Sequence, residues 1–539
     1  MERKSFAVGA VDALGRKLPL EAKKRADKKV GLFYFLWNGE HGNPDELKVQ
    51  NISDILRKDP QAGYKPDDKI WGTEPVLYYW GKPIYGYYLS REKWVMSKHV
   101  ELFVQADIDF LLFDTTNAFT YPDVAISLME VLEDGRKQGF KVPQIGYFTN
   151  SYAGETAQRI YEEIYKKNVY PDLWYCVDGK PLLITHEGEC SAEIKQFFTI
   201  REAQWPIEPD RENAFPWISF IMPQTVYYDK DGNHGVISVS PAQHPQLSMG
   251  DSALYGETGN RSRSYYNGEN HITDDSKLYG YNYQEQWNMA IESDAETVFL
   301  TGWNEWTMNR IQGSKERPIL FVDNADEEYS RDIEPMDGAL QDNYYMQTVS
   351  NIRRFKGYDA DLYSVRIIAN NSDIFEQAEA VPEICPFHPA VTLRQFPGYE
   401  KMCFEDFSAV NRFVSLKLLQ DEKNVYFLAS TEESLLPWKQ GVEVRLFCSD
   451  EKNKYLVRIE SATQEVNILS VINGKENRIG KADIIFQENN IAVELPKVLF
   501  HNIIYFQWTV SDIPIENTMD LYLHGGCAPV GRFKFAAKL

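Results

Sequence analysis

A carboxylate between two tryptophans is the most informative chemical feature of the chain. Residues 298–306 read VFLTGWNEW, an apolar run with strand character that is followed at once by Trp303, Asn304, Glu305 and Trp306. A pyranose ring has apolar C–H faces that stack on indoles and hydroxyl groups that need polar partners. Breaking its glycosidic bond requires proton transfer at a positioned carboxyl group. The segment therefore indicates a sugar site in which Glu305 is the acid or the base.

Polar and aromatic side chains also stand where other predicted strands end, which is where a barrel of strands and helices carries its active site. We expect a second catalytic carboxylate at Asp114 or Glu187. We expect substrate contacts from Trp37, Asn117, Asn150, His186, Gln243, His244, Trp303, Asn304 and Trp306. The same inventory includes Gln224, Tyr227 and Tyr228. Because Arg and Lys are nearly absent from it, this set suits a carbohydrate better than a phosphate.

Each of these residues also has a purely structural interpretation. Glu305 would then be a buried carboxylate that fixes a barrel loop, Asp114 an Asx-type cap on the turn that follows it, and Glu187 one half of a loop salt bridge. The histidines would serve hydrogen bonding or packing, and the aromatic residues would belong to the core. The sequence leaves these alternatives open.

The composition restricts the partners. The chain has 539 residues and a formal net charge of −22, from 57 Lys and Arg against 79 Asp and Glu. This balance argues against nucleic acid or an anionic membrane surface as partner. The six cysteines lie far apart and show no CxxC or Cys/His pattern with zinc spacing. We therefore expect a glycan partner, no metal, no cofactor and no dense disulfide framework, and the sequence does not indicate an oligomeric state.

The N-terminal arm, residues 1–29, is charged and lacks the apolar core of a signal peptide. The rest of the chain has no run of about 20 apolar residues that could span a bilayer. We therefore expect a soluble protein, cytoplasmic as the sequence stands, or exported if a signal peptide has been removed.

The elements that would position these residues alternate between strand and helix. Eight apolar runs predict strands, at 28–37, 109–114, 143–148, 181–186, 217–222, 235–240, 297–302 and 318–323. Helical patterns occur near 92–106, 122–139, 154–167, 283–293 and 342–355. This alternation predicts an α/β fold, a (β/α)₈ TIM barrel over 30–368. An open doubly wound sheet is the competing fold, but no GxGxxG or phosphate loop follows any strand.

The pattern changes after about residue 369. Short alternating or β-rich runs separated by turn residues fill the remainder, such as FVSLKLL, VEVRLF, KYLVRIE and IIYFQWTV. Few stretches there have the length or periodicity of a long helix. We predict an antiparallel β-sandwich over 369–539.

The predicted barrel resembles the clan of glycoside hydrolase families 71 and 99 and their relatives. The resemblance covers roughly residues 30–357 and depends on the NEW triplet at a late strand end, the early strand that ends at Trp37, and the last helix, DNYYMQTVSNIRRFKG. It implies a (β/α)₈ enzyme. Several members of the clan act on α-linked glycans, and family 99 contains endo-α-mannosidases.

One position departs from the pattern of family 99. The family motif continues as NEWxEG, and its second carboxylate, three residues after the first, shares the acid and base roles. Met308 stands at that position here. Glu305 therefore carries over from the family and the second carboxylate does not, so neither the family's anhydro-sugar mechanism nor its stereochemistry transfers. Asp114 and Glu187 are the candidates to replace it.

The C-terminal part resembles the β-sandwich of carbohydrate-binding module family 9 in the runs NVYFLAS, VEVRLF and MDLYLHGGCAPVGRFKF. The resemblance implies sugar-stacking aromatic residues, for which Trp438 and Trp508 are the available tryptophans. A purely structural sandwich docked on the barrel is the alternative.

Three functions are compatible with these observations. The favoured one is a glycoside hydrolase that cleaves an oligo- or polysaccharide, with α-linked glycans implied by the resemblance, through carboxylate acid and base catalysis. The second is a glycosyltransferase-like protein of polysaccharide biosynthesis, which would need a nucleotide-sugar site. The third is a non-catalytic glycan-binding protein, motivated by Met308.

Overall fold

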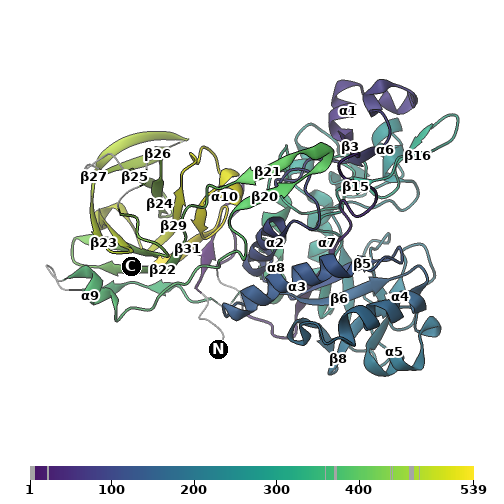
Figure 1. Ribbon diagram of the computed structural model, residues 1–539, viewed down its shortest axis with the longest axis horizontal. Helices are drawn as coiled ribbons and strands as arrows, with labels where there is room; N and C mark the ends of the chain where they lie inside the picture. Colours follow the sequence, from purple (N-terminus) through teal and green to yellow (C-terminus); the bar gives the residue numbers. More distant parts are fainter. Residues whose placement is uncertain are drawn as a thin grey trace.

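A body of parallel strands and helices and a largely antiparallel sheet lie side by side along the long axis of the molecule (Figure 1). The computed structural model describes residues 6–20, 23–358, 360–368, 373–436, 439, 441–460, 466–472 and 474–539. Within these ranges, none of the helices combines the length and apolar character that crossing a bilayer requires.

Eight parallel strands form a nearly closed barrel, which confirms the predicted fold class. Each strand pairs with the next one in the chain, and the last pairs with the first, except that the sixth and seventh are adjacent without a ladder. The strands are β2 (Lys29–Tyr34), β5 (Phe110–Thr115), β6 (Gln144–Thr149), β8 (Lys180–Thr185), β9 (Thr199–Gln204), β10 (Ala214–Pro216), β11 (Val236–Val239) and β14 (Thr297–Leu300).

Two of the eight predicted strands are wrong. The run 217–222 lies just after β10 and is not itself a strand, and 318–323 contributes only β17 (Ile319–Leu320), which pairs with β16 (Ile311–Gln312) outside the barrel. The strands missed from the sequence are β10, which ends just before the run 217–222, and β9, in which Arg201 breaks the apolar pattern. This buried guanidinium donates to the carbonyls of Asn213, Ala214 and His234 and so replaces the missing ladder beside β10.

Phenylalanine fills the inside of the barrel. Phe33 packs edge to face against Phe148 and Phe299, with ring centroids 5.5 and 5.8 Å apart, and all three are buried. Phe110 and Phe215 belong to the same cluster. The interior is therefore a packed core, and chemistry is confined to the ends of the strands.

Helices surround most of the barrel. Those predicted near 92–106, 122–139, 154–167, 283–293 and 342–355 are present, the third continuing as a π-helical turn (Tyr161–Tyr165). They are α2 (Lys93–Ala106), α3 (Pro122–Lys137), α4 (Ala153–Ile160), α7 (Tyr281–Glu292) and α8 (Asn343–Lys356). A short helix, α5 (Ala192–Phe197), precedes β9.

The segment 38–90, between β2 and α2, contains secondary structure of its own. It forms a small lobe with β3 (Lys48–Asn51), α1 (Ile52–Lys58) and β4 (Val76–Tyr79), beside α6 (Met249–Tyr255) (Figure 1). β4 pairs antiparallel with β15 (Thr307–Met308), which begins two residues after Glu305. The lobe therefore holds the backbone on the C-terminal side of Glu305, the candidate carboxylate.

The C-terminal sheet buries its own hydrophobic core, which includes Leu418, Phe427, Leu446 and Trp508. Its long strand β27 pairs with β26 through its first part and with β28 through its second. The main strands are β22 (Phe413–Gln420), β23 (Asn424–Thr431), β24 (Glu443–Ser449), β25 (Lys454–Glu460), β26 (Val466–Ile472), β27 (Lys475–Gln487), β28 (Asn490–Pro496), β29 (Ile503–Ser511) and β31 (Lys534–Lys538).

Both ends of the chain contribute to the contact between the bodies. β1 (Val8–Gly9), in the predicted N-terminal arm, pairs antiparallel with β31. The hairpin β20 (Arg394–Pro397) and β21 (Cys403–Asp406) reaches back onto the barrel, where Arg394 forms a buried ion pair with Glu92. The boundaries at 29/30 and 368/369 remain predictions.

Candidate active site

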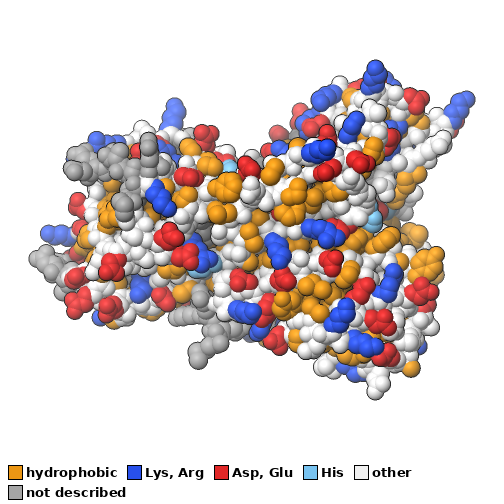
Figure 2. All heavy atoms as spheres, viewed as in Figure 1, with side chains coloured by type: hydrophobic (Ala, Val, Ile, Leu, Met, Phe, Trp, Pro, Cys, Tyr) orange, Lys and Arg blue, Asp and Glu red, His pale blue; other side chains and the backbone are white. Residues whose placement is uncertain are grey.

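Six of the predicted site residues stand at the carboxyl ends of barrel strands. Asp114 is the penultimate residue of β5, and the others follow β2, β6, β8, β11 and β14 in the order Trp37, Asn150, His186, His244 and Glu305. Parallel strands place these ends on one face of the barrel. In Figure 2 the surface is hollowed at the right edge, between the lobe that carries α1 and α6 and the part that carries α4.

Glu305 is held by donors on one of its two oxygens. Oε2 accepts hydrogen bonds from Arg331 Nη2 at 2.9 Å and from Asn324 Nδ2 at 3.1 Å. The backbone N–H of Glu305 donates to Asp332 Oδ1 at 2.8 Å. The side chain is 14% exposed, and Oε1 accepts no hydrogen bond from the described residues. One carboxyl oxygen thus remains available to a ligand.

Burial raises the pKa of Glu305 to about 8, against the opposing effect of Arg331, and the charges of Asp323 and Asp332 add to the rise. Burial also raises the pKa of Asp332 to about 6. Three carboxyl groups surround one guanidinium, so the cation does not neutralise all of them. Glu305 can therefore keep a proton near neutral pH and donate it, as a general acid must.

Arg331 is the centre of this cluster, although the sequence did not indicate it. Its guanidinium is 1% exposed, lies 3.5 Å from Asp323 Oδ1, and has its carbon 4.8 Å from the centre of the Trp217 ring. Its Nη1 donates to His244 Nδ1 at 3.2 Å. Asp323 was also missed, although it ends the apolar run 318–323, where the strand-end rule would have found it.

The neighbours of Glu305 fix the local backbone. They are Asn304 and Trp306 of the NEW triplet, and Trp303 before it. The Asn304 side chain accepts from Phe35 N at 2.9 Å and donates to Phe35 O at 3.0 Å. Trp306 stacks on Trp80, with ring centroids 4.3 Å apart. Trp303 and Trp306 are fully buried, so neither ring is free to stack on a sugar. We assign all three a packing and positioning role.

Asp114 forms the Asx-type cap that was the structural interpretation of this residue. It accepts hydrogen bonds from the backbone N–H and the hydroxyl of Thr116, at 3.0 and 2.7 Å, as an Asx-type cap does. It is buried, and this burial raises its pKa, while the side chain of Trp37 lowers it. Asn117 is exposed in the same turn.

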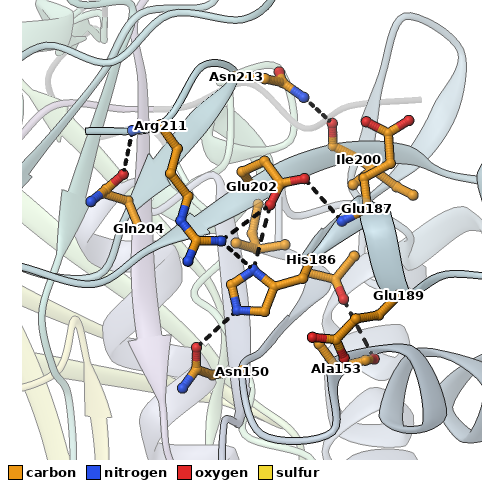
Figure 3. Close-up of polar contacts among 12 residues, drawn as sticks. Asn150, Ala153, His186, Glu187, Glu189, Ile200, Glu202, Gln204, Arg211 and Asn213 are labelled. Carbon is orange, nitrogen blue, oxygen red and sulfur yellow. Dashed lines mark hydrogen bonds and ion pairs between the residues drawn. The ribbon is translucent and has the colours of Figure 1, made fainter. Parts of the chain in front are cut away.

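A second polar cluster lies around His186 (Figure 3). Asn150 Oδ1 lies 3.2 Å from His186 Nε2, and Arg211 Nη1 lies 2.9 Å from Nδ1. Glu202 lies 3.4 Å from the same ring. The Glu187 carboxyl points away from the histidine in Figure 3 and pairs with Lys230 at 2.7 Å, which is the loop salt bridge of the alternative interpretation.

Four residues of the predicted inventory are occupied by structural contacts. Gln243 is fully buried and binds Asn282, and Gln224 is buried behind β11. Tyr227 forms an antiparallel bridge with Val236 at the start of β11. Tyr228 donates to Asp294, just before β14, and so lies toward the amino ends of the strands. The misplaced strand at 217–222 is the reason for the errors at Gln224, Tyr227 and Tyr228.

Aromatic pairs border the strand ends instead. Trp205 and Trp217 stack with centroids 4.5 Å apart after β9 and β10. Phe119 is 53% exposed after β5, with its ring 5.2 Å from that of His41. Arg211 and Arg331 also place cations at the carboxyl-end face, where the sequence indicated almost none. Both contact carboxylates.

Two cavities lie away from this face. One of about 430 Å³ is at the amino ends of the strands, lined by Lys29, Thr199 and Thr297, and one of about 630 Å³ lies between the barrel and the C-terminal sheet. The carboxyl-end face is favoured over them because it gathers Glu305, Arg331 and the aromatic pairs.

In the C-terminal sheet, Trp508 is fully buried between strands and has no ring face open to a sugar. Trp438 lies outside the described residues. The predicted sugar-stacking role of Trp508 is therefore wrong, since its burial leaves only packing.

No protein-family model and no curated protein matches the chain. The structure is similar to that of the GH99 endo-α-mannosidase from Bacteroides thetaiotaomicron, with a TM-score of 0.35 and 15% identity over 60% of this chain and 97% of that one. A family 9 carbohydrate-binding module (CBM9) from Caldicellulosiruptor kristjanssonii, in complex with glucose, has a TM-score of 0.15 and 9% identity over 32% of this chain and 83% of that one. Both resemblances inferred from the sequence are confirmed, as similarities of fold alone.

Proposed function

We propose that this chain is a glycoside hydrolase that cleaves an oligo- or polysaccharide at the carboxyl-end face of the barrel. The observation that carries the proposal is Glu305, a buried carboxyl with a pKa raised to about 8 and one oxygen free of hydrogen bonds. A glycosidic oxygen is a poor leaving group until it is protonated, so a carboxyl that holds its proton near neutral pH supplies what the reaction needs.

The surroundings of Glu305 support a sugar as the ligand. The Trp205–Trp217 pair and Phe119 offer aromatic surfaces, and Asn150 and His186 offer hydrogen-bonding groups. An apolar ring face beside polar groups is the combination that a pyranose requires.

The test is a panel of α- and β-linked glycans and aryl glycosides, assayed for released products with wild-type protein and E305Q. Glutamine keeps the shape and accepts the same hydrogen bonds but carries no transferable proton. We expect E305Q to lose at least about 10³-fold in kcat/KM on any glycan that the wild type cleaves. Wild-type turnover by E305Q would contradict the assignment of the acid.

A non-catalytic glycan-binding protein is the second candidate. It is favoured by Met308, which is buried in β15 opposite Tyr78 of β4 at the position where the family carries its second carboxylate. This candidate predicts saturable glycan binding by calorimetry with no product released by the wild type. Product formation by the wild type that E305Q abolishes would rule it out.

A further inference from the structure

The carboxylate missing at Met308 has a substitute on the other side of Arg331. Glu305 Oε2 and Asp323 Oδ1 both approach the same nitrogen, Arg331 Nη2, at 2.9 and 3.5 Å. The two oxygens are therefore at most 6.4 Å apart, the sum of these distances. No comparable link joins Glu305 to either carboxylate predicted from the sequence.

Asp323 is also the most accessible acid of the cluster. Its side chain is 42% exposed, and its contacts with Arg331 and His244 all fall on Oδ1, at 3.5 to 3.6 Å. Oδ2 accepts no hydrogen bond from the part of the chain that the structure describes. By contrast, Asp114 is buried and bound by Thr116, and Glu187 is paired with Lys230.

His244 presents a neutral imidazole to Asp323. An arginine can only donate, so the contact of Arg331 Nη1 with His244 Nδ1 at 3.2 Å places the imidazole proton on Nε2, the nitrogen 3.6 Å from Asp323 Oδ1. Burial and the charge of Arg331 lower the pKa of His244 to about 4, so the ring is neutral. It therefore presents an N–H to Asp323 and no base that would compete with it.

The separation bears on stereochemistry. Retaining glycosidases hold their two carboxyl groups about 5–5.5 Å apart, whereas inverting enzymes need about 6.5–9.5 Å to admit a water molecule. The limit of 6.4 Å applies to Glu305 Oε2 and Asp323 Oδ1, the two oxygens that Arg331 holds, and it is compatible with a retaining pair.

We propose that Asp323 is the nucleophile and Glu305 the acid and base of a retaining hydrolysis, an inference that rests on the proposed function. In the first step an Asp323 oxygen bonds to the anomeric carbon, the bond from that carbon to the leaving oxygen breaks, and Glu305 gives its proton to the leaving oxygen. In the second step a water oxygen bonds to the same carbon, Glu305 takes the water proton, and the ester bond to Asp323 breaks. The covalent intermediate is a glycosyl ester of this chain.

Arg331 supports both states of this cycle. It donates to Glu305 whether that carboxyl is protonated or ionised, and its charge offsets the carboxylates while the ring of Trp217 covers its face. Because one buried cation contacts both acids, a change in the charge of either acid alters the electrostatic environment of the other.

The test uses the full-length protein and an aryl glycoside of the sugar that the panel identifies. Proton NMR of the first product should show retained anomeric configuration. D323N should lose at least about 10³-fold in kcat/KM. D323A should regain turnover with azide and form a glycosyl azide of inverted configuration, because azide replaces the missing nucleophile. D337N, a change at an exposed carboxylate that pairs with Lys82, is the matched control and should keep wild-type rates.

The outcomes separate the two proposals. If the wild type cleaves a glycan and E305Q does not, while D323N stays within about threefold of the wild type, the role of Asp323 is refuted and the hydrolase assignment stands. An inverted product refutes the covalent step alone. If the wild type cleaves no glycan in the panel, the proposed function fails and this inference fails with it. Circular dichroism of D323N, whose side chain is isosteric, checks that the fold is intact.

Discussion

Trp306 donates its indole N–H to the carboxyl of Glu334 across 2.5 Å, with both side chains fully buried. The same carboxyl lies 2.9 Å from His99 Nε2 and accepts from the Tyr88 hydroxyl at 2.9 Å. Because Trp306 follows Glu305 directly, this network fixes the backbone that carries the candidate acid. The two tryptophans that suggested a sugar platform in the sequence are instead part of the support beneath it.

W306F tests this support. Phenylalanine keeps an aromatic ring against Trp80 but removes the donor to Glu334, so a buried carboxyl oxygen loses a partner. We expect the free energy of unfolding to fall by about 1–3 kcal/mol in urea denaturation, with a loss of kcat on any identified glycan. Y64F, at an exposed tyrosine of the small lobe, should change stability by less than about 0.5 kcal/mol. Equal effects of the two changes would contradict the proposed support.

The pKa of Glu305 predicts a pH dependence of stability. The value is raised from 4.5 to about 8 in the folded chain. A carboxyl with a raised folded pKa stabilises the fold fully below its unfolded pKa and loses that contribution as the pH rises through the folded value. We expect the unfolding free energy of wild type minus that of E305Q to decrease from about pH 4.5 to about pH 8 and then to level off. A difference that does not change over this window would argue against the raised pKa.

The same titration predicts the alkaline limb of activity. Only the protonated form of Glu305 can donate to a leaving oxygen, so kcat/KM of the wild type should fall about tenfold per pH unit above pH 8. Glycosides whose leaving groups need no protonation, such as dinitrophenyl glycosides, should show a weaker fall in the first step. The pH profiles of the two substrate classes measure the contrast directly.

Replacement of Arg331 should lower the free energy of unfolding more than any other single substitution at the site. R331M removes the cation from Glu305 and Asp323 and leaves buried charge without a partner, which costs about 3–5 kcal/mol in comparable pairs. The cost should be largest at alkaline pH, where the carboxyls cannot escape it by taking up protons. R211M is the matched control, because Arg211 is 37% exposed and its pairing with Glu208 is solvated. Urea denaturation of both variants at two pH values tests the difference.

The buried pair of Arg394 and Glu92 should hold the C-terminal hairpin on the barrel. Arg394 also packs over the rings of Trp94 and Phe404, with its guanidinium carbon 4.7 and 4.2 Å from their centres. R394M should lower the unfolding free energy by about 3–5 kcal/mol and speed proteolysis within β20 and β21. R412M breaks the exposed pair with Glu432 and should cost less than about 1 kcal/mol.

Part of this fold could be predicted from the sequence because its strands are apolar on both faces. β2, β5, β6, β11 and β14 read as continuous hydrophobic runs, as buried parallel strands do. β9 could not be found in this way, because Arg201 satisfies backbone carbonyls that only the folded neighbours bring to it. The run 318–323 has the same apolar composition but packs under the small lobe, and nothing local distinguishes the two cases.

The site residues likewise divide into those that the sequence could predict and those that it could not. His186 follows its strand directly, and Glu305 and His244 lie five residues beyond the ends of theirs, so strand position is enough to place them. Arg331 comes from a loop after β17 and reaches Glu305 only because Asn324 and Asp332 anchor that loop to the chain around it. Burial could not be predicted either, so Trp303 and Trp306 were expected to contact sugar.

The pairing of Val8 with Phe535 closes a ring through almost the whole polypeptide. During synthesis the barrel can fold long before β31 leaves the ribosome, so the first strand must wait unpaired for the last one. Closing so long a loop is slow and entropically costly. It can occur only after β31 has been synthesised. Assembly of the molecule should therefore finish at the seam between β1 and β31, and deletion of residues 6–9 should leave an already folded barrel attached to a sheet in which Lys534 and Phe535 lie at a bare edge, next to the pairing of Tyr363 and Ser364 with the end of β31.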